Sequence, residues 1–179
     1  MMLFQNPIIW LMRFRKRKGY GVHSPFAFDF ITNVIYNKER YYAYKDMDRC
    51  LRWWEKGRVK SMRHLAFRLT NFHEPKTIYC DGQDTHILEA CKQGSKEMKL
   101  IATDSPQMAD MILLARADEK AMTHLDEGTM LVLKNLRKEK DFWKRIKEDN
   151  RVTVTFDMYD VGVAFAKKRL NKQHYKINW

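Results

Sequence analysis

The chain has 179 residues, of which 45% are hydrophobic, and it carries 34 Lys and Arg against 22 Asp and Glu. That length supports one domain-sized core with an appendage, and three cysteines without a CxxC pair argue against a disulfide framework and a zinc site. We therefore expect reduced thiols and a cytoplasmic protein. The charge is uneven, since residues 1–76 carry 16 basic and 6 acidic residues while residues 77–160 carry 13 and 16.

Residues 1–23 form an N-terminal arm in which an apolar run precedes a basic one. The apolar run, residues 7–12, is too short to span a bilayer, and its charges follow it, whereas a secretory signal has them in front. The arm either packs on its own domain or lies as an interfacial helix on anionic lipid, and Trp10 and Phe14 favour the first alternative. Its candidate contacts for nucleic acid or another anionic partner are Arg13, Arg15, Lys16, Arg17 and Lys18.

Residues 24–75 predict a helical cap of three short helices. Ser24 is a good N-cap and Pro25 suits the first helical position, so a phenylalanine-rich helix begins there. Two further helices, each opened by a capping side chain, are expected at residues 46–57 and 61–75. Apolar residues recur in all three segments at helical spacing.

Residues 76–179 predict an α/β domain. Strands are expected at residues 77–81, 99–103, 111–114, 130–133, 152–156 and 161–165, with helices between them. This alternation implies a mainly parallel sheet covered on both faces. The last two strands lie only a few residues apart, which requires an antiparallel pair. We expect residues 26–179 to form one compact unit.

The residues that follow the strands decide the chemistry of such a sheet. Ligands bind beyond the carboxyl ends of the strands, near the point where the strand order reverses. The first strand is followed by Asp81 and Gly82, a single glycine where a nucleotide loop needs several. Asp104 follows the second strand and either accepts hydrogen bonds from ribose hydroxyls or caps a turn. Arg116 and Lys134 follow the next two strands, where acid, base or metal chemistry requires carboxylates.

Two motifs lie near the ends of the chain. The opening reads G-x-G-V-H-S-P-F-x-F-x-F-I at residues 19–31, and three tyrosines follow within residues 41–44. The ending reads V-T-x-T-x-D-x-Y-x-x-G-x-x-F at residues 152–165, with Q-H-Y at residues 173–175. Both motifs resemble a family of class I S-adenosylmethionine-dependent methyltransferase-like proteins, and the middle of the chain is similar in element order and hydrophobicity only. The resemblance implies a Rossmann-like methyltransferase fold whose last two strands form the antiparallel pair.

The resemblance also implies where a cofactor would bind. It places the cofactor loop at Asp81 and Gly82 and the ribose-binding acid at Asp104, and His86 lies on the first turn after the loop. The chain lacks the second glycine of the family's loop, and basic or apolar residues replace the family's later carboxylates. Too few residues separate Asp104 from Asp110 for a further helix and strand, so one βα repeat is expected to be missing. We interpret the chain as a degenerate, non-catalytic member without a catalytic residue or a metal.

Three functions remain open at this point. The first is a pseudoenzyme that acts by binding a ligand, a partner protein or a second copy of itself. The second is an active methyltransferase that uses S-adenosylmethionine in an atypical pocket. The third is a basic protein that binds RNA, DNA or an anionic membrane through residues 13–18 and 52–68. Trp53, Trp54 and the tyrosines of residues 41–44 lie among basic residues and either stack on bases or fill the core.

Overall fold

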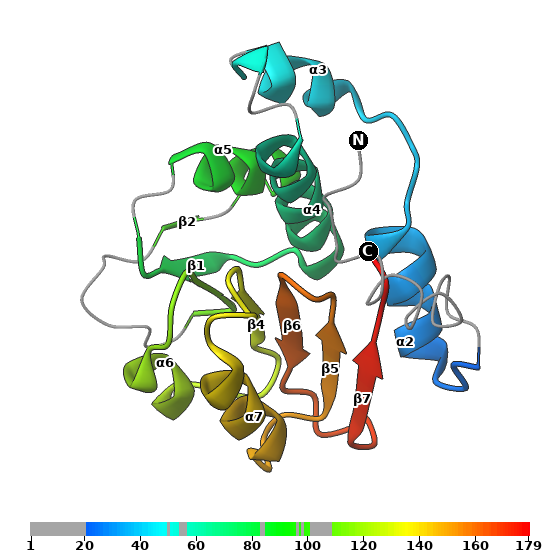
Figure 1. Ribbon diagram of the computed structural model, residues 1–179, viewed down its shortest axis with the longest axis vertical. Coiled ribbons are helices and arrows are strands. Elements are labelled where there is room, and N and C mark those ends of the chain that lie inside the picture. The colour runs from blue at the N-terminus through cyan, green and yellow to red at the C-terminus, as the bar shows by residue number, and fades with distance from the viewer. Residues whose placement is uncertain are drawn as a thin grey trace. The chain divides into compact units, whose positions relative to one another are not determined.

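The computed structural model describes residues 21–49, 51–53, 57–82, 85–95, 97, 99–100 and 109–179. The chain divides into two units (Figure 1). The helical unit contains residues 1–74 and 84–97, and the sheet unit contains residues 75–83 and 98–179. No helix in the described part of the chain combines the length and the apolar composition that a bilayer crossing demands.

The helical unit begins with the phenylalanine-rich helix that the sequence predicts. Its elements are α2 (Pro25–Asp29), the π-helix η2 (Phe30–Ile35), α3 (Tyr42–Arg49), α4 (Arg58–His73) and α5 (Thr85–Gly94). The hydroxyl of Ser24 accepts a hydrogen bond from the Ala27 amide at 3.3 Å, and Pro25 occupies the first turn, so the predicted cap is confirmed. Before the cap, Gly21 adopts a φ of 77°, a left-handed conformation that favours glycine.

Two predicted helix starts are wrong, and both helices begin earlier in the chain. The helix expected to open at Asp46 begins four residues before it, because the ring of Tyr44 packs on Phe67 of α4 with 5.5 Å between centroids. This tertiary contact extends the helix beyond the local capping signal. Likewise Ser61 does not cap α4, since its amide donates to the Gly57 carbonyl at 3.1 Å and lies inside the helix.

The sheet unit contains the strands β1 (Thr77–Cys80), β2 (Lys99–Leu100), β3 (Met111–Leu114), β4 (Met130–Leu133), β5 (Val154–Asp157), β6 (Gly162–Phe165) and β7 (Gln173–Lys176), and the helices α6 (Glu119–Thr123) and α7 (Lys140–Glu148). The strand order is β2-β1-β3-β4-β6-β5-β7. β2, β1, β3 and β4 pair in parallel, whereas β6 pairs antiparallel with both β4 and β5. The α/β class, the mainly parallel sheet and the closing antiparallel pair are therefore confirmed. Strand β7, parallel to β5, was not predicted.

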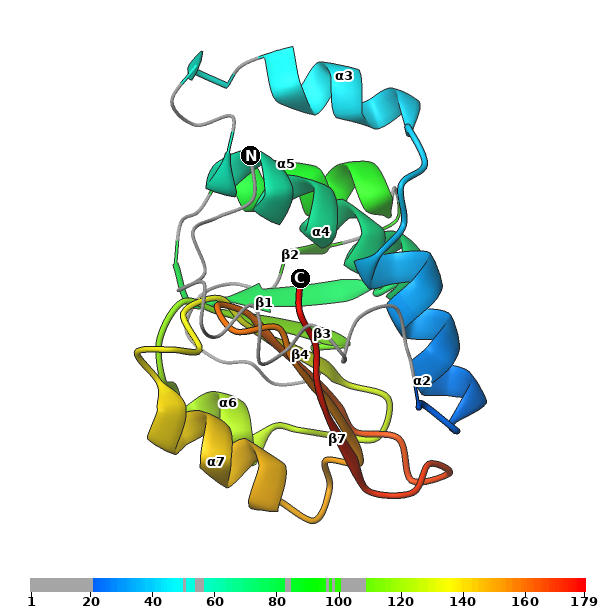
Figure 2. The same ribbon diagram turned by 45° about the vertical axis from the view of Figure 1, so that its right-hand side comes forward.

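Helices α6 and α7 lie side by side against one face of this sheet, as Figure 2 shows. The cluster beneath them joins alternate strand residues such as Ile112 and Leu131 to Phe142, Trp143 and Ile146 of α7. The strand residues that point to the other face are also buried. Both faces are thus apolar, which is why these strands read as continuous hydrophobic runs in the sequence.

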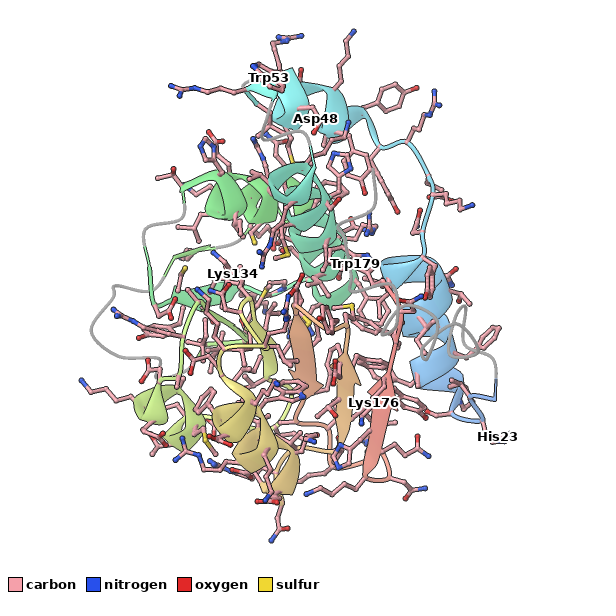
Figure 3. All side chains as sticks on the ribbon, in the orientation of Figure 1. His23, Asp48, Trp53, Lys134, Lys176 and Trp179 are labelled. Carbon is pink, nitrogen blue, oxygen red and sulfur yellow. The ribbon has the colours of Figure 1, made fainter. Side chains whose placement is uncertain are left out.

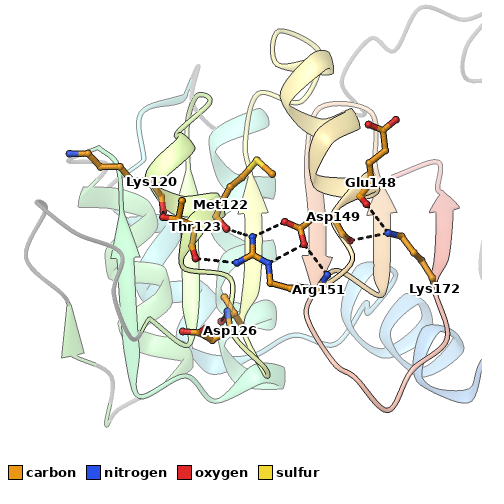
Figure 4. A network of polar contacts seen from close by, with 9 residues as sticks. Lys120, Met122, Thr123, Asp126, Glu148, Asp149, Arg151 and Lys172 are labelled. Atoms are coloured by element: carbon orange, nitrogen blue, oxygen red, sulfur yellow. Dashed lines mark hydrogen bonds and ion pairs between the residues drawn. The ribbon is translucent and has the colours of Figure 1, made fainter.

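Arg151 contacts the C-terminal ends of α6 and α7 (Figure 4). Its guanidinium donates to the carbonyls of Met122 and Thr123 at 2.6 and 3.1 Å, at the end of α6. It also contacts both carboxylate oxygens of Asp149, directly after α7. The hydrogen bond from Arg151 lowers the pKa of Asp149, although burial opposes it. The side chain therefore satisfies carbonyls that a helix end leaves unpaired.

Candidate functional site

The strand order of the sheet unit reverses between β1 and β3, and this point is the candidate site. β1 pairs with β2 on one side and with β3 on the other, all three in parallel. The loops that follow β1 and β3 therefore emerge at the same edge of the sheet, where α/β proteins bind ligands. These loops are residues 81–82 in the described part and residues 115–118.

Asp81 joins the two loops at the reversal point. One carboxylate oxygen accepts a hydrogen bond from the Ala115 amide at 2.9 Å, and the other accepts from Ala115 at 2.8 Å and from Arg116 at 3.2 Å. The Asp81 amide itself donates to the Leu113 carbonyl at 3.2 Å, which continues the ladder between β1 and β3. The carboxylate thus binds backbone amides of the neighbouring loop and holds that loop in place.

A second contact between the same loops comes from Tyr79, the residue before Cys80 in β1. Its hydroxyl donates to one oxygen of Asp118 at 3.0 Å, while the other oxygen accepts from the Lys120 amide and caps α6. Burial and the bond to Asp118 raise the pKa of Tyr79 to about 12. The phenol therefore stays protonated at neutral pH and acts as a hydrogen-bond donor. The Cys80 thiol also donates locally, to the Gly82 carbonyl at 2.9 Å.

The loop after β4 extends these contacts along the edge of the sheet. The side-chain amide of Asn135 donates to the Ala115 carbonyl at 2.7 Å, so the loop after β3 is held from both of its neighbours. Further along, Arg137 lies 3.8 Å from an Asp160 carboxylate oxygen and 4.6 Å from the ring centre of Tyr159. Tyr159 adopts a φ of 76°, and its amide donates to Asp157, which fixes the turn between β5 and β6.

The polar groups of this edge consequently bind one another. Asp81, Asp118, Asp157 and Asp160 each have a donor or a cation within the sheet unit. Across the described residues, no three His, Cys, Asp or Glu side chains gather closely enough to hold a metal ion.

The residues predicted for the site are only partly brought together. Asp81 and Gly82 lie side by side after β1, and a Cβ added to Gly82 would meet no atom within 4 Å. His86 is an exposed residue on the first turn of α5, in the helical unit. The predicted ribose-binding acid and basic-arm residues lie outside the described residues, namely Asp104, Arg13, Arg15, Lys16, Arg17 and Lys18.

The sequence did not indicate the partners of Asp81, Tyr79 and Asn135. Each bond joins residues at least 20 positions apart, and only the strand register brings their loops together. A usable signal was present in one case. When an Asp follows an apolar strand and the neighbouring parallel strand ends at the same edge of the sheet, the carboxylate lies close to the backbone amides that follow the neighbouring strand.

Comparisons with models of protein families, with curated proteins and with solved structures return no match to this chain.

Proposed function

We propose that this chain is a degenerate methyltransferase-type α/β protein that acts by binding a partner and does not transfer a methyl group. The motifs at residues 19–31 and 152–165 support the assignment to this type. The antiparallel pair of β5 and β6 is the ending that this resemblance implies. Only residues 101–110 separate β2 from β3, which supports the loss of one βα repeat.

The observation that carries the proposal is the engagement of the Asp81 carboxylate. In the resembled family an acidic residue at this position precedes the glycine-rich cofactor loop. A carboxylate has about four acceptor positions, and the amides of Ala115 and Arg116 use three of them here. A cofactor that accepted the two hydrogen bonds of a ribose at Asp81 would find one position left and would displace at least one of these amides from its acceptor.

The rest of the loop fits S-adenosylmethionine no better. Gly82 stands alone, so the chain after β1 lacks the second small residue that lets the backbone approach a nucleotide. Asn135 and Asp81 together hold the neighbouring loop from both sides. The described residues at this edge therefore do not suit the cofactor.

Isothermal titration calorimetry of the full-length chain with S-adenosylmethionine and with S-adenosylhomocysteine tests this proposal. We expect no binding heat from either compound at concentrations that saturate ordinary methyltransferases. Binding at low micromolar strength would overturn the proposal. A circular dichroism spectrum of the same sample establishes that a negative result comes from folded protein.

A further inference from the structure

A second surface of the molecule, on the helical unit, carries exposed aromatic rings. Three large hydrophobic side chains of the described residues are strongly exposed, and two of them flank the same helix, α3. Tyr42, at its first position, is 98% exposed, and Trp53, shortly after its end, is 77% exposed. Figure 3 shows Trp53 at the outer edge of α3. Rings of this size are normally buried, so two strongly exposed rings within twelve residues of the chain call for a functional reason.

Cationic side chains lie between these two rings along the chain. Lys45 and Arg49 follow Tyr42 by three and seven positions, which places all three on one face of α3. Both cations are exposed, as is Arg52 beside Trp53. We call this set the aromatic-basic stripe: Tyr42, Lys45, Arg49, Arg52 and Trp53. Asp46 lies on the same side and reaches Arg49 at 3.6 Å.

The opposite side of α3 is fixed to α4 by other residues. The ring of Tyr44 stacks on His64 with 3.7 Å between centroids, and its hydroxyl accepts a hydrogen bond from Arg68 at 3.1 Å. Asp48 contacts His64 at 2.9 Å and Lys60 at 2.7 Å. These contacts attach the opposite side of α3 to α4 through residues outside the stripe.

We propose that the aromatic-basic stripe binds single-stranded nucleic acid. Exposed rings offer faces on which bases stack, and the cations between them neutralise phosphates. The eight residues of α3, which carry Tyr42, Lys45 and Arg49, span about 12 Å, and Trp53 follows the helix four residues after its end.

A lipid surface fits the stripe less well. An interfacial helix needs a continuous apolar face that enters the acyl region. The larger side chains Met47 and Leu51 of this segment are instead buried within the protein. Isolated rings separated by cations match a chain of bases and phosphates better than they match acyl chains.

This inference deepens the proposed binding function by naming a partner class, and it rests on that function. The two can fail separately, because the stripe lies on α3 and the residues just after it, whereas cofactor binding concerns the loops of the sheet unit. Methyltransferase activity with an oligonucleotide substrate would refute the proposed function and leave the stripe intact. Absence of oligonucleotide binding would refute the stripe alone.

Fluorescence anisotropy of a short labelled oligouridylate, titrated with the full-length chain at low salt, provides the test. The double variant Tyr42→Leu/Trp53→Leu is expected to bind about tenfold or more weakly, since stacking contributes about 1–3 kcal/mol per base. The matched control is Phe28→Leu, which removes the third exposed ring among the described residues and should bind as the original chain does. Circular dichroism establishes that all variants remain folded.

The charges are tested by the salt dependence of the same affinity. Lys45→Gln/Arg49→Gln should lower the slope of log K against log salt by roughly 1.4, because each phosphate contact to a single strand contributes about 0.7. Lys120→Gln/Lys140→Gln on the sheet unit makes the same change in net charge and should leave the slope unaltered. Asp46→Asn should strengthen binding, because it removes the carboxylate beside Arg49.

Three results would overturn the proposal. The first is no oligonucleotide binding at low salt. The second is binding that the Tyr42 and Trp53 substitutions affect no more than Phe28→Leu does. The third is preferential binding to vesicles of anionic phospholipid over the oligonucleotide, which would identify the stripe as a membrane contact.

Discussion

Gly162, the first residue of β6, allows Trp143 of α7 to approach the sheet backbone closely. A Cβ at this position would lie 2.7 Å from two carbons of the Trp143 indole and 2.8 Å from Cδ1 of Leu136. Carbon atoms in favourable contact are about 3.5–4.0 Å apart. Trp143 and Leu136 are 3% and 6% exposed, so neither can move into solvent to relieve the overlap. Gly162→Ala is therefore expected to destabilise the sheet unit.

The expected loss follows from overpacking a filled core. Insertions of this kind cost about 1–3 kcal/mol when the neighbours must leave their preferred rotamers. For a chain of this size, each kcal/mol lowers the unfolding temperature by about 2–4 °C. Thermal and urea unfolding, followed by circular dichroism and by the fluorescence of the chain's tryptophans, would measure the change.

Gly82→Ala is the matched control, because an added Cβ there meets no atom within 4 Å and the residue has no left-handed φ. Such a substitution commonly raises stability by about 0.4–1 kcal/mol through the unfolded chain. The two glycines should thus respond with opposite signs. Equal stability of the two variants would show that the packing of Trp143 against β6 is not as described.

Three further predictions concern the helical unit and the helix ends. Gly94→Ala should also destabilise, by about 1–3 kcal/mol in urea unfolding, because its Cβ would lie 2.5 Å from the Phe67 carbonyl oxygen; unchanged stability would refute the close approach of α4 and α5. Arg151→Ala should lower the free energy of unfolding by about 1 kcal/mol, because it removes the bonds to the carbonyls after α6. The lowered pKa of Asp149 stabilises the fold above about pH 4, and this stability is lost as the carboxyl protonates at lower pH. The variant should therefore also lose this part of the acid sensitivity. Burial lowers the pKa of His64 below 6.5, although the hydrogen bond to Asp48 opposes the shift. The neutral ring therefore stabilises the fold above pH 6.5, and this stability is lost as the pH falls. His64→Gln should reduce the change in the urea midpoint between about pH 5 and about pH 7.5.

The sheet could be predicted because its signals are local. Strands such as Met130–Leu133 are uninterrupted apolar runs, and the short connection between β5 and β6 allows only antiparallel pairing. The cap at Ser24 is equally local, since the hydroxyl and its partner amide lie three residues apart. Strand β7 was not predicted because Gln173–Lys176 contains no aliphatic side chain and its residues alternate between half-buried and exposed.

The candidate site could be predicted in position but not in chemistry. That Asp81 follows the first strand is visible in the sequence, and the place of this strand end in an α/β sheet follows from general rules. Its partners are not visible, because the amides of Ala115 and Arg116 lie 34 and 35 residues away and any residue type supplies an amide. The start of α3 was mistaken for a related reason, since a contact to Phe67 on another helix determines it.

The most direct measurement is the thermal unfolding of the original chain and of Asp81→Ala, each with and without S-adenosylmethionine, with Asp141→Ala as the control for loss of an exposed carboxylate. Removal of the Asp81 carboxylate leaves two backbone amides without their acceptor and should cost about 1–3 kcal/mol. We expect Asp81→Ala to unfold at a lower temperature than both other proteins, and S-adenosylmethionine to shift none of them. A rise in the unfolding temperature of the original chain with S-adenosylmethionine, abolished in an Asp81→Ala variant of otherwise unchanged stability, would contradict the account.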